Sequence, residues 1–179
     1  MFTLQPAEDG DAAILLALRD AAAWWQVRNG IVQWSPGEVG LEEIRAQIAA
    51  GEWLVLRESA ADGPAVRAAC RLLWSDPALW GDQPGNAGYV HGLVIDRACA
   101  STGLGRRVLD LVAEQVSRTG RTFLRLDCVE GNQRLRDYYR SLGFREAGRR
   151  EFDTGWNDVV LLERVLNPAS AHAKNPGGR

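Results

Sequence analysis

The sequence Gly103-Leu104-Gly105 joins a stretch that reads as an apolar strand to one that reads as a helix. Backbone amides at the N-terminus of a helix favour a bound anion, so this loop could wrap a pyrophosphate group. Neighbouring side chains fit the same use, because Ser101 and Thr102 could supply hydroxyl groups and Arg106 could supply positive charge. Taken alone, Gly-x-Gly is equally compatible with a loop-to-helix turn that needs small residues.

The glycine loops of other nucleotide-binding folds do not fit this spacing. The Rossmann dinucleotide fingerprint places its first glycine in a tight turn directly after the strand. Here the seven residues from Asp96 to Thr102 follow Ile95, and Val108 stands where the third glycine would be. Asp127 does lie about ~20 residues downstream, as a ribose contact would require. The same gap argues against a Rossmann-like methyltransferase, and the Gly-Lys-Ser/Thr of a Walker A loop is absent.

A second group of candidate residues lies further along the chain. Asn132 stands at the start of a predicted helix, Tyr139 lies within it, and Gly143-Phe144 follow it. Asn132 also has a structural explanation as an N-cap residue, and Tyr139 could be a core tyrosine with a satisfied hydroxyl group. Tyr138 points to another part of the helix surface and is predicted to be a packing residue.

Two residues are candidates for a general base. His91 lies on the strand before the glycine loop, on the same predicted face as Tyr89 and Leu93, and histidine titrates near neutral pH. A buried structural histidine is the alternative. Asp127 stands near the end of the next predicted strand, where a carboxylate could take the same role.

Hydrophobic periodicity and turn residues predict the elements that hold these side chains. The predicted strands cover about residues 3–4, 53–57, 66–74, 89–95, 123–129, 149–153 and 159–165. The predicted helices cover about residues 11–28, 41–51, 104–118 and 133–142. Residues 75–86 are predicted to form a loop. The order indicates an α/β (α+β) protein with a mixed sheet and helices on both faces. We expect one domain over residues 1–166 and a disordered tail over residues 167–179.

The composition excludes several classes of protein. With 179 residues, 46% hydrophobic and 25% charged, and a net charge of -2, the chain has no long-range attraction for nucleic acid or an anionic membrane. Cys70, Cys99 and Cys128 lie far apart, and His91 and His172 are the histidines, so we expect neither a disulfide framework nor a metal site. The N-terminus has no signal-peptide pattern, and no apolar run approaches the ~20 residues of a membrane span. The expected location is the cytosol.

The chain resembles the GCN5-related N-acetyltransferase (GNAT) superfamily. The resemblance is carried, in order and spacing, by Tyr89-Val90-His91-Gly92-Leu93-Val94-Ile95-Asp96, Gly103-Leu104-Gly105-Arg106, Leu126-Asp127-Cys128 and Asn132…Tyr138-Tyr139…Leu142-Gly143-Phe144. It is strongest from Tyr89 to Phe144, and the rest agrees in element order only. One position departs: the family loop usually begins with Arg or Gln, where this chain has Ala100.

This resemblance implies acetyl-coenzyme A (acetyl-CoA) as co-substrate, with no metal, and a mostly antiparallel sheet whose strands 89–95 and 123–129 splay apart. The pantetheine arm would pair with main-chain groups of Leu93, Val94 and Ile95, and Asn132 would hydrogen-bond to it. The pyrophosphate would lie on the loop that contains Ser101, Thr102, Gly103, Leu104, Gly105 and Arg106. Gly92 marks either a bulge in the strand or a close approach of a helix.

The resemblance also implies catalytic roles. Tyr139 occupies the family's tyrosine position and would donate to the departing thiolate, since a phenol has a pKa near ~10 and a thiol near ~8.5. His91 would take the proton of the attacking amine. The first helix with its following loop and the turn before the last strand would flank the acceptor site. Trp34 and Trp156 are therefore the predicted substrate-binding residues, by cation–π contact or stacking.

We expect a small-molecule N-acetyltransferase that acts on a primary amine. A protein or peptide N-acetyltransferase and a non-catalytic acyl-CoA-binding domain are the alternatives. A nucleic-acid binder is disfavoured because Glu146 and Glu151 offset the arginines between Arg134 and Arg150. Homodimers are common among relatives, and an exposed final strand could support one. The sequence does not identify the acceptor amine.

Overall fold

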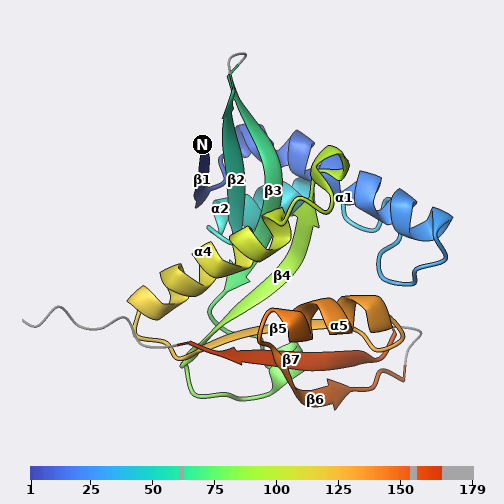
Figure 1. Cartoon of the computed structure of the whole chain (residues 1–179), viewed down its shortest axis with the longest axis vertical. Coiled ribbons are helices and arrows are strands. Elements are labelled where there is room, and N and C mark those ends of the chain that lie inside the picture. The colour runs from blue at the N-terminus through green and yellow to red at the C-terminus, as the bar shows by residue number, and fades with distance from the viewer. Residues whose placement is uncertain (61–62, 154–156, 167–179) are drawn as a thin grey trace, which may run out of the picture.

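The computed structural model describes residues 1–60, 63–153 and 157–166 (Figure 1). The predicted tail and Trp156 therefore lie outside the described residues. Within the described ranges, the strands form one sheet in the order β1-β2-β3-β4-β5-β7-β6. They are β1 (Phe2–Pro6), β2 (Trp53–Ala60), β3 (Gly63–Leu73), β4 (Ala87–Ile95), β5 (Phe123–Val129), β6 (Arg145–Arg150) and β7 (Val159–Val165). Only the β4–β5 pair is parallel, so the predicted mostly antiparallel sheet is confirmed.

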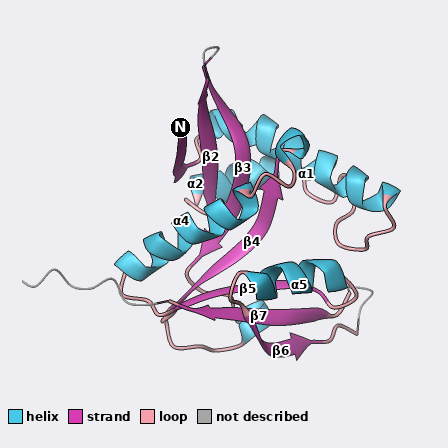
Figure 2. Cartoon of the chain, viewed as in Figure 1, coloured by secondary structure: helices cyan, strands magenta, loops and turns pink. Residues whose placement is uncertain are grey.

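Helices cover both faces of the sheet (Figure 2). They are α1 (Ala12–Arg28), α2 (Leu41–Ala49), α3 (Pro77–Trp80), α4 (Leu104–Arg118) and α5 (Gln133–Ser141), with 3-10 turns η1 (Asp9–Asp11) and η2 (Arg97–Cys99). The apolar faces of α4 and α5 share one core cluster with the sheet, and those of α1 and α2 share another. Each amphipathic helix thus buries one stripe against the sheet, as its 3.6-residue period predicts.

Two sequence expectations were wrong. The predicted loop at residues 75–86 contains α3, whose N-cap Asp76 and following Pro77 are typical of a helix start. The next-to-last strand begins at Arg145 rather than Arg149, and all six of its residues are exposed, so it has no alternation to reveal it. It forms the edge of the sheet, and β7 lies between β5 and β6. The final strand is therefore not the exposed one.

Strands β4 and β5 are paired over only part of their length. Their register joins residues 87–90 to residues 123–126, and Val90 with Leu126 is the last pair. Beyond it, β4 diverges from β5, β7 and β6 (Figure 1). The backbone groups of β4 from His91 to Ile95 therefore have no β5 partner, and the predicted splay is confirmed.

A bulge interrupts β4 at the start of the splay. The register pairs Ala69 with Val94 and Arg71 with His91, so β4 carries one extra residue. Gly92 lies there with φ 57°, a conformation that suits glycine. A Cβ at this position would meet no atom closer than 3.5 Å, so the backbone conformation rather than helix packing requires the glycine.

The bulge reverses the alternation of side chains along β4. Val90 packs in the cluster with α4, whereas Val94 packs in the cluster with α1 and α2. Leu93 also packs toward α4, so the expected shared face of His91 and Leu93 was wrong. One extra residue in a strand moves every later side chain to the other face. His91 consequently faces the α1 and α2 side, while Leu93 faces α4.

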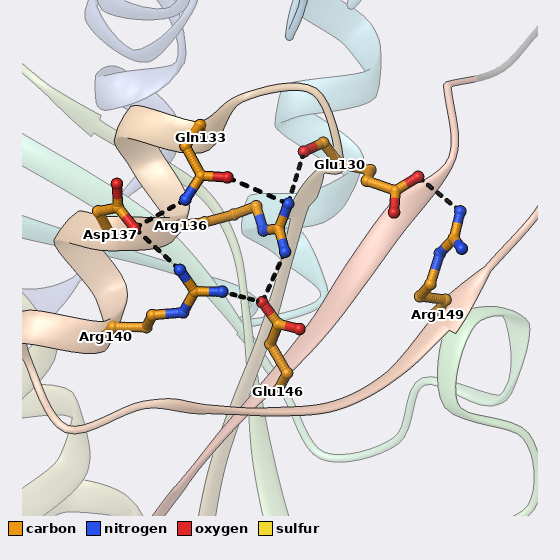
Figure 3. A network of polar contacts seen from close by, with 7 residues as sticks. All are labelled: Glu130, Gln133, Arg136, Asp137, Arg140, Glu146 and Arg149. Carbon is orange, nitrogen blue, oxygen red and sulfur yellow. Dashed lines mark hydrogen bonds and ion pairs between the residues drawn. The ribbon is translucent and has the colours of Figure 1, made fainter.

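Polar side chains hold α5 against the neighbouring strands (Figure 3). Arg136 and Arg140 both contact the carboxylate of Glu146, and Arg149 pairs with Glu130 at 2.6 Å. The arginine bonds lower the pKa of Glu146, with Arg136 as the largest cause. These arginines are neutralised locally, and the network fixes the helix that carries the predicted site residues Asn132 and Tyr139.

Candidate active site

One continuous cleft with a volume of about 1190 Å³ reaches from α1 to the loop before α4. We call the end lined by η2, the glycine loop and α5 the cofactor half. The acceptor half is the end lined by α1, the loop after it, α2 and β3, together with His91 and Asp127. The splayed part of β4 lies between the two halves and lines the cleft from Val90 to Ile95. His91, Trp34 and the predicted cofactor residues other than Thr102 and Arg106 therefore line one cavity.

The loop before α4 has the backbone shape of an anion site. Ser101 has φ 64° and Gly103 has φ 84°, so two residues of the loop adopt the left-handed conformation. Among the described residues, the amides of residues 101–103 have no backbone acceptor, and the first-turn amides of α4 have none within the helix. Successive free amides in such a turn form a concave anion-binding nest. The strained conformation of Ser101, a non-glycine residue, costs about 1–3 kcal/mol, which is typical of functional loops.

The side chains around this loop differ in what they offer. The Thr102 hydroxyl donates to the carbonyl oxygen of Cys99 at 2.7 Å, so it is engaged within the loop. Ser101 and Arg106 are exposed. Two further exposed arginines that sequence reasoning did not select, Arg97 and Arg134, line the cleft. They supply the positive charge that Ala100 lacks.

The two adjacent tyrosines of α5 both line the cleft. A Cβ on Gly105 would lie 2.6 Å from the Tyr138 hydroxyl oxygen, so residue 105 must lack a side chain for Tyr138 to fit. Tyr138 therefore packs, as predicted, but its hydroxyl group also faces the glycine loop. Asn132 caps α5 by accepting the amide of residue 135, and its amide group donates to Gln33 Oε1 at 3.3 Å. Both the structural and the cleft-facing role of Asn132 are compatible with this geometry.

Tyr139 is buried, with 6% of its surface exposed, between α5 and the sheet. Its ring packs edge-on against Phe144, with ring centroids 5.8 Å apart. Its hydroxyl group has no hydrogen bond among the described residues. Burial raises the pKa of the phenol far above its usual value, and Cys128 and Asp127 act in the same direction. Tyr139 therefore stays protonated and has a free O–H at the cleft.

His91 lies between two carboxylates. Its Nε2 is 3.2 Å from Asp76 Oδ2, and its Nδ1 is 3.6 Å from Asp127 Oδ1. The Nε2 and Oδ2 atoms are both buried and lack the alignment of a hydrogen bond. Asp127, on the Nδ1 side, lines the cleft, whereas Asp76 does not. Burial raises the pKa of Asp127; His91 opposes this shift and Asp76 adds to it.

Sequence reasoning missed Asp76 because it was assigned to an unstructured loop. A buried cation, the guanidinium of Arg125, holds that loop in place. Arg125, 6% exposed, donates to Glu163 at 2.6 Å and to the Tyr89 hydroxyl at 3.1 Å, and its guanidinium lies 4.6 Å from the ring centroid of Trp80 at the end of α3. This cluster attaches α3 to β4 and β5. Asp76, the N-cap of α3, is thereby held behind His91.

The acceptor half is lined by aromatic and charged side chains. Trp34 lines the cleft, and one face of its ring carries the guanidinium of Arg19, 4.6 Å from the ring centroid. Trp25 carries Arg97 in the same way at 4.0 Å. Trp156, the other predicted substrate-binding residue, lies outside the described residues. In the part of the chain that the structure describes, no group of His, Cys, Asp and Glu could hold a metal ion. None of its helices is long and apolar enough to cross a membrane.

Comparisons with known proteins agree with this arrangement. The family model "Acetyltransferase (GNAT) family" matches residues 19–144. The uncharacterized N-acetyltransferase YesJ of Bacillus subtilis is 30% identical over 146 residues, which are 80% of this chain and 81% of that protein. The aminoglycoside N(6')-acetyltransferase type 1 of Stenotrophomonas maltophilia is 30% identical over 151 residues, 84% of this chain and 91% of that protein.

Solved structures share the fold. A GNAT-family acetyltransferase from Listeria monocytogenes superposes with a TM-score of 0.75 at 24% identity, covering 92% of this chain and 95% of that one. The yncA protein of Salmonella typhimurium, solved with its cofactor acetyl-CoA, has a TM-score of 0.67 at 18% identity and covers 96% and 97% of the two chains. The chain therefore belongs to the acetyltransferase (GNAT) family of acetyl-CoA-dependent N-acetyltransferases.

Proposed function

We propose that the protein transfers an acetyl group to the primary amine of a small molecule, by direct attack of the amine on the thioester of acetyl-CoA. The proposal is carried by the position of His91. It lies between Asp76 and Asp127, at the start of the part of β4 that has no β5 partner, and it lines the same cleft as the glycine loop. Direct attack is favoured over an acyl-enzyme at Cys128, because burial raises the pKa of this thiol to about 12.

The cofactor residues of the proposal follow from the backbone. Main-chain groups of Leu93, Val94 and Ile95, which have no β5 partner, would pair with the pantetheine arm as an added strand would. Amides from Ser101 to Arg106 would hold the pyrophosphate. One N–H of the Asn132 amide group donates to Gln33, and its second N–H would donate to the pantetheine. Bound acetyl-CoA supplies the electrophilic thioester carbon.

His91 is the proposed base. Asp76 lies on the Nε2 side, where a carboxylate favours the tautomer with its proton on Nε2 and leaves the Nδ1 lone pair toward the cleft. Nδ1 would accept the proton that the amine must lose before it attacks, and Asp127 lies 3.6 Å away to stabilise the imidazolium. As the nitrogen–carbon bond forms and the carbon–sulfur bond breaks, backbone amides at the Gly92 bulge are the candidates to stabilise the oxyanion.

Tyr139 would stabilise the leaving thiolate. Its raised pKa makes full transfer of the phenolic proton unfavourable, because a thiol is the stronger acid. A hydrogen bond from the otherwise unpartnered O–H to the sulfur remains favourable, and such a bond to a charged acceptor is worth about 1.5–3 kcal/mol. We therefore assign Tyr139 as a hydrogen-bond donor rather than a proton source.

A small-molecule acceptor is supported by the loop after α1. Gln33 in this loop reaches Asn132 on α5 at 3.3 Å, so the loop bridges the cleft, which a protein acceptor would need open. The named substrate class of the Stenotrophomonas relative, aminoglycosides, is a small-molecule class. The proposal keeps residues 1–166 as one catalytic domain and the cytosol as its location. A homodimer through an edge of the sheet would have to use β1 or β6 rather than the final strand.

Calorimetric titration with acetyl-CoA, beside NAD and S-adenosylmethionine, tests the cofactor assignment. Micromolar binding of acetyl-CoA alone is expected, and absence of binding would overturn the catalytic proposal. A thiol-release screen with aminoglycosides, polyamines, amino acids and peptides then tests the acceptor. Release that occurs with peptides but with no small amine would contradict the small-molecule assignment and favour the protein-acetylating alternative.

A further inference from the structure

Arg19 of α1 extends its guanidinium into the acceptor half of the cleft. Its side chain is 15% exposed, and its guanidinium carbon lies over the ring of Trp34, 4.6 Å from the ring centroid. Its Nη1 atom would be 3.8 Å from a Cβ at Gly92, so the guanidinium reaches the β4 bulge next to His91. The bulge is where the proposed reaction would take place, and Arg19 is therefore within reach of the groups that surround the attacking nitrogen.

Two arginines line this half of the cleft, and their charges are compensated to different degrees. Arg71 donates from both Nε and Nη2 to Glu52 Oε2, at 3.0 and 2.5 Å. Arg19 makes a single hydrogen bond among the described residues, to Glu38 Oε2 at 3.4 Å. That oxygen also accepts the amide of Ser35, and the Glu38 side chain is 42% exposed. Four of the five N–H donors of Arg19 are thus left for another acceptor.

The surroundings of Arg19 disfavour its charge. Burial lowers its pKa, Glu38 and Glu43 oppose this shift, and Arg71 adds to it. A guanidinium does not lose its proton in proteins, so Arg19 stays positively charged. A bound anion would compensate this buried charge. Trp34 contacts the guanidinium, and the N–H donors that Glu38 does not engage could form two parallel hydrogen bonds to a carboxylate or phosphonate.

We propose that Arg19 binds an anionic group of the acceptor, so that the acceptor is an amine with a carboxylate or similar acid close to the nucleophilic nitrogen, as in an α-amino acid. This inference rests on the proposed function and narrows its substrate class. Because Arg19 and His91 flank the same bulge, the acid and the amine must be separated by few bonds. In an α-amino acid a single carbon atom joins them.

A polycationic acceptor is the opposite choice, and Glu38 and Glu43 at the cleft are the residues that would favour it. Both carboxylates are already engaged. Glu38 holds Arg19 and the amide of Ser35, and Glu43 accepts from Gln47 at 2.9 Å. Arg19, in contrast, is buried and keeps N–H donors that have no acceptor among the described residues. This half of the cleft therefore suits an anionic acceptor better than a polycationic one.

The test compares acceptors that differ only in the acid. Thiol release is measured for L-leucine, L-phenylalanine and L-glutamate, each against its α-amide, together with spermidine and kanamycin. We expect kcat/KM to be at least ~10-fold higher for the free acids. The amine of an amino-acid amide is less basic than that of the free acid, so a larger fraction of it is unprotonated and reactive at neutral pH. A preference for the free acids therefore cannot arise from intrinsic reactivity. Equal or faster reaction of the amides or polyamines would overturn the inference while leaving the proposed function standing.

Variants assign the preference to Arg19. Arg19→Gln is expected to raise KM for the free acids about 10- to 100-fold and to leave the amides within about threefold. Arg19→Lys keeps the charge but not the planar fork, so its KM for the free acids should lie between those of the wild type and Arg19→Gln. Arg28→Gln, an exposed arginine on the same helix, is the matched control and should change nothing. A uniform loss for all acceptors with Arg19→Gln would contradict the inference. If the wild type acetylates no amine in either set, the proposed function fails and this inference fails with it.

Discussion

The two halves of the cleft differ in whether backbone groups or side chains line them. In the cofactor half, the groups available to a ligand are mainly backbone amides and carbonyls, supplied by the open edge of β4 and by the loop from Ala100 to Gly105. In the acceptor half, side chains from α1, α2, β3, β4 and β5 line the cleft, among them Arg19, His91 and Asp127. A backbone site depends on conformation and tolerates many side chains. A side-chain site depends on a few identities that distant segments bring together.

This difference predicts that the largest single effect comes from a glycine of the cofactor half. In Gly103→Val a β-branched residue would have to adopt φ 84°, and its side chain would fill the concave face of the loop. We expect acetyl-CoA affinity to fall by at least ~100-fold, because the loop would lose the amide geometry that holds a pyrophosphate. Calorimetric titration of the folded variant measures it.

Gly120→Val is the matched control for backbone strain. Gly120 follows α4 with φ 80° and, like Gly103, has no atom within 4 Å of the position that a Cβ would take, but it does not line the cleft. Both variants should lose similar thermal stability, and only Gly103→Val should lose cofactor binding. Equal binding by the two variants would show that the loop does not hold the pyrophosphate.

The next largest effect is expected in the acceptor half, at the proposed base. His91→Gln should lower kcat by about 10²-fold or more, as the loss of a positioned base does, with little change in acetyl-CoA affinity. Asp76→Asn should have a smaller effect on kcat. The imidazolium of His91 would lose a negative charge that lies 3.2 Å from its Nε2 atom. An unchanged kcat in Asp76→Asn would remove Asp76 from the mechanism.

The same contrast explains what could be predicted from the sequence. The position of the glycine loop could be predicted from a local signal, Gly103 and Gly105 before a helix, whereas the resemblance to the family predicted the splayed strands and placed Tyr139 relative to Gly143-Phe144. Asp76 was not predicted, because its position beside His91 depends on a loop that Arg125 holds from another strand. Leu93 was placed on the wrong face because one extra residue at Gly92 reverses the alternation, and a bulge leaves only a glycine in the sequence.

A side chain of the cofactor half that would take part in the reaction sharpens the comparison. Tyr139→Phe removes the O–H that would face the sulfur and leaves the packed ring in place. We expect kcat to fall about 10- to 100-fold with cofactor affinity nearly intact. The melting temperature should not decrease, since the hydroxyl group has no partner among the described residues.

Tyr138→Phe is the natural companion variant, because its hydroxyl group faces Gly105 in the cofactor half. It should alter acetyl-CoA affinity rather than kcat. An unchanged kcat in Tyr139→Phe would remove that residue from the mechanism, and a kcat loss confined to Tyr138→Phe would transfer the role to its neighbour.

The smallest expected effect concerns stability and Asp127. Burial raises its pKa above the unfolded value of about ~3.9, so the folded state binds the proton more tightly than the unfolded chain does. Stability therefore falls as pH rises through the window between the two pKa values. Asp127→Asn removes the cost of burying a charged carboxylate, and the melting temperature at pH 7 should rise by about 1–4 °C, while the exposed Asp82→Asn should leave it unchanged. The gain should disappear toward pH 4, as calorimetry across this range would measure.

Turnover of Asp127→Asn should fall, because the imidazolium of His91 loses its neighbour at 3.6 Å. A lower melting temperature at pH 7 would mean that an ion pair with His91 outweighs the cost of burial, and that the acceptor half is organised for stability as well as for proton transfer.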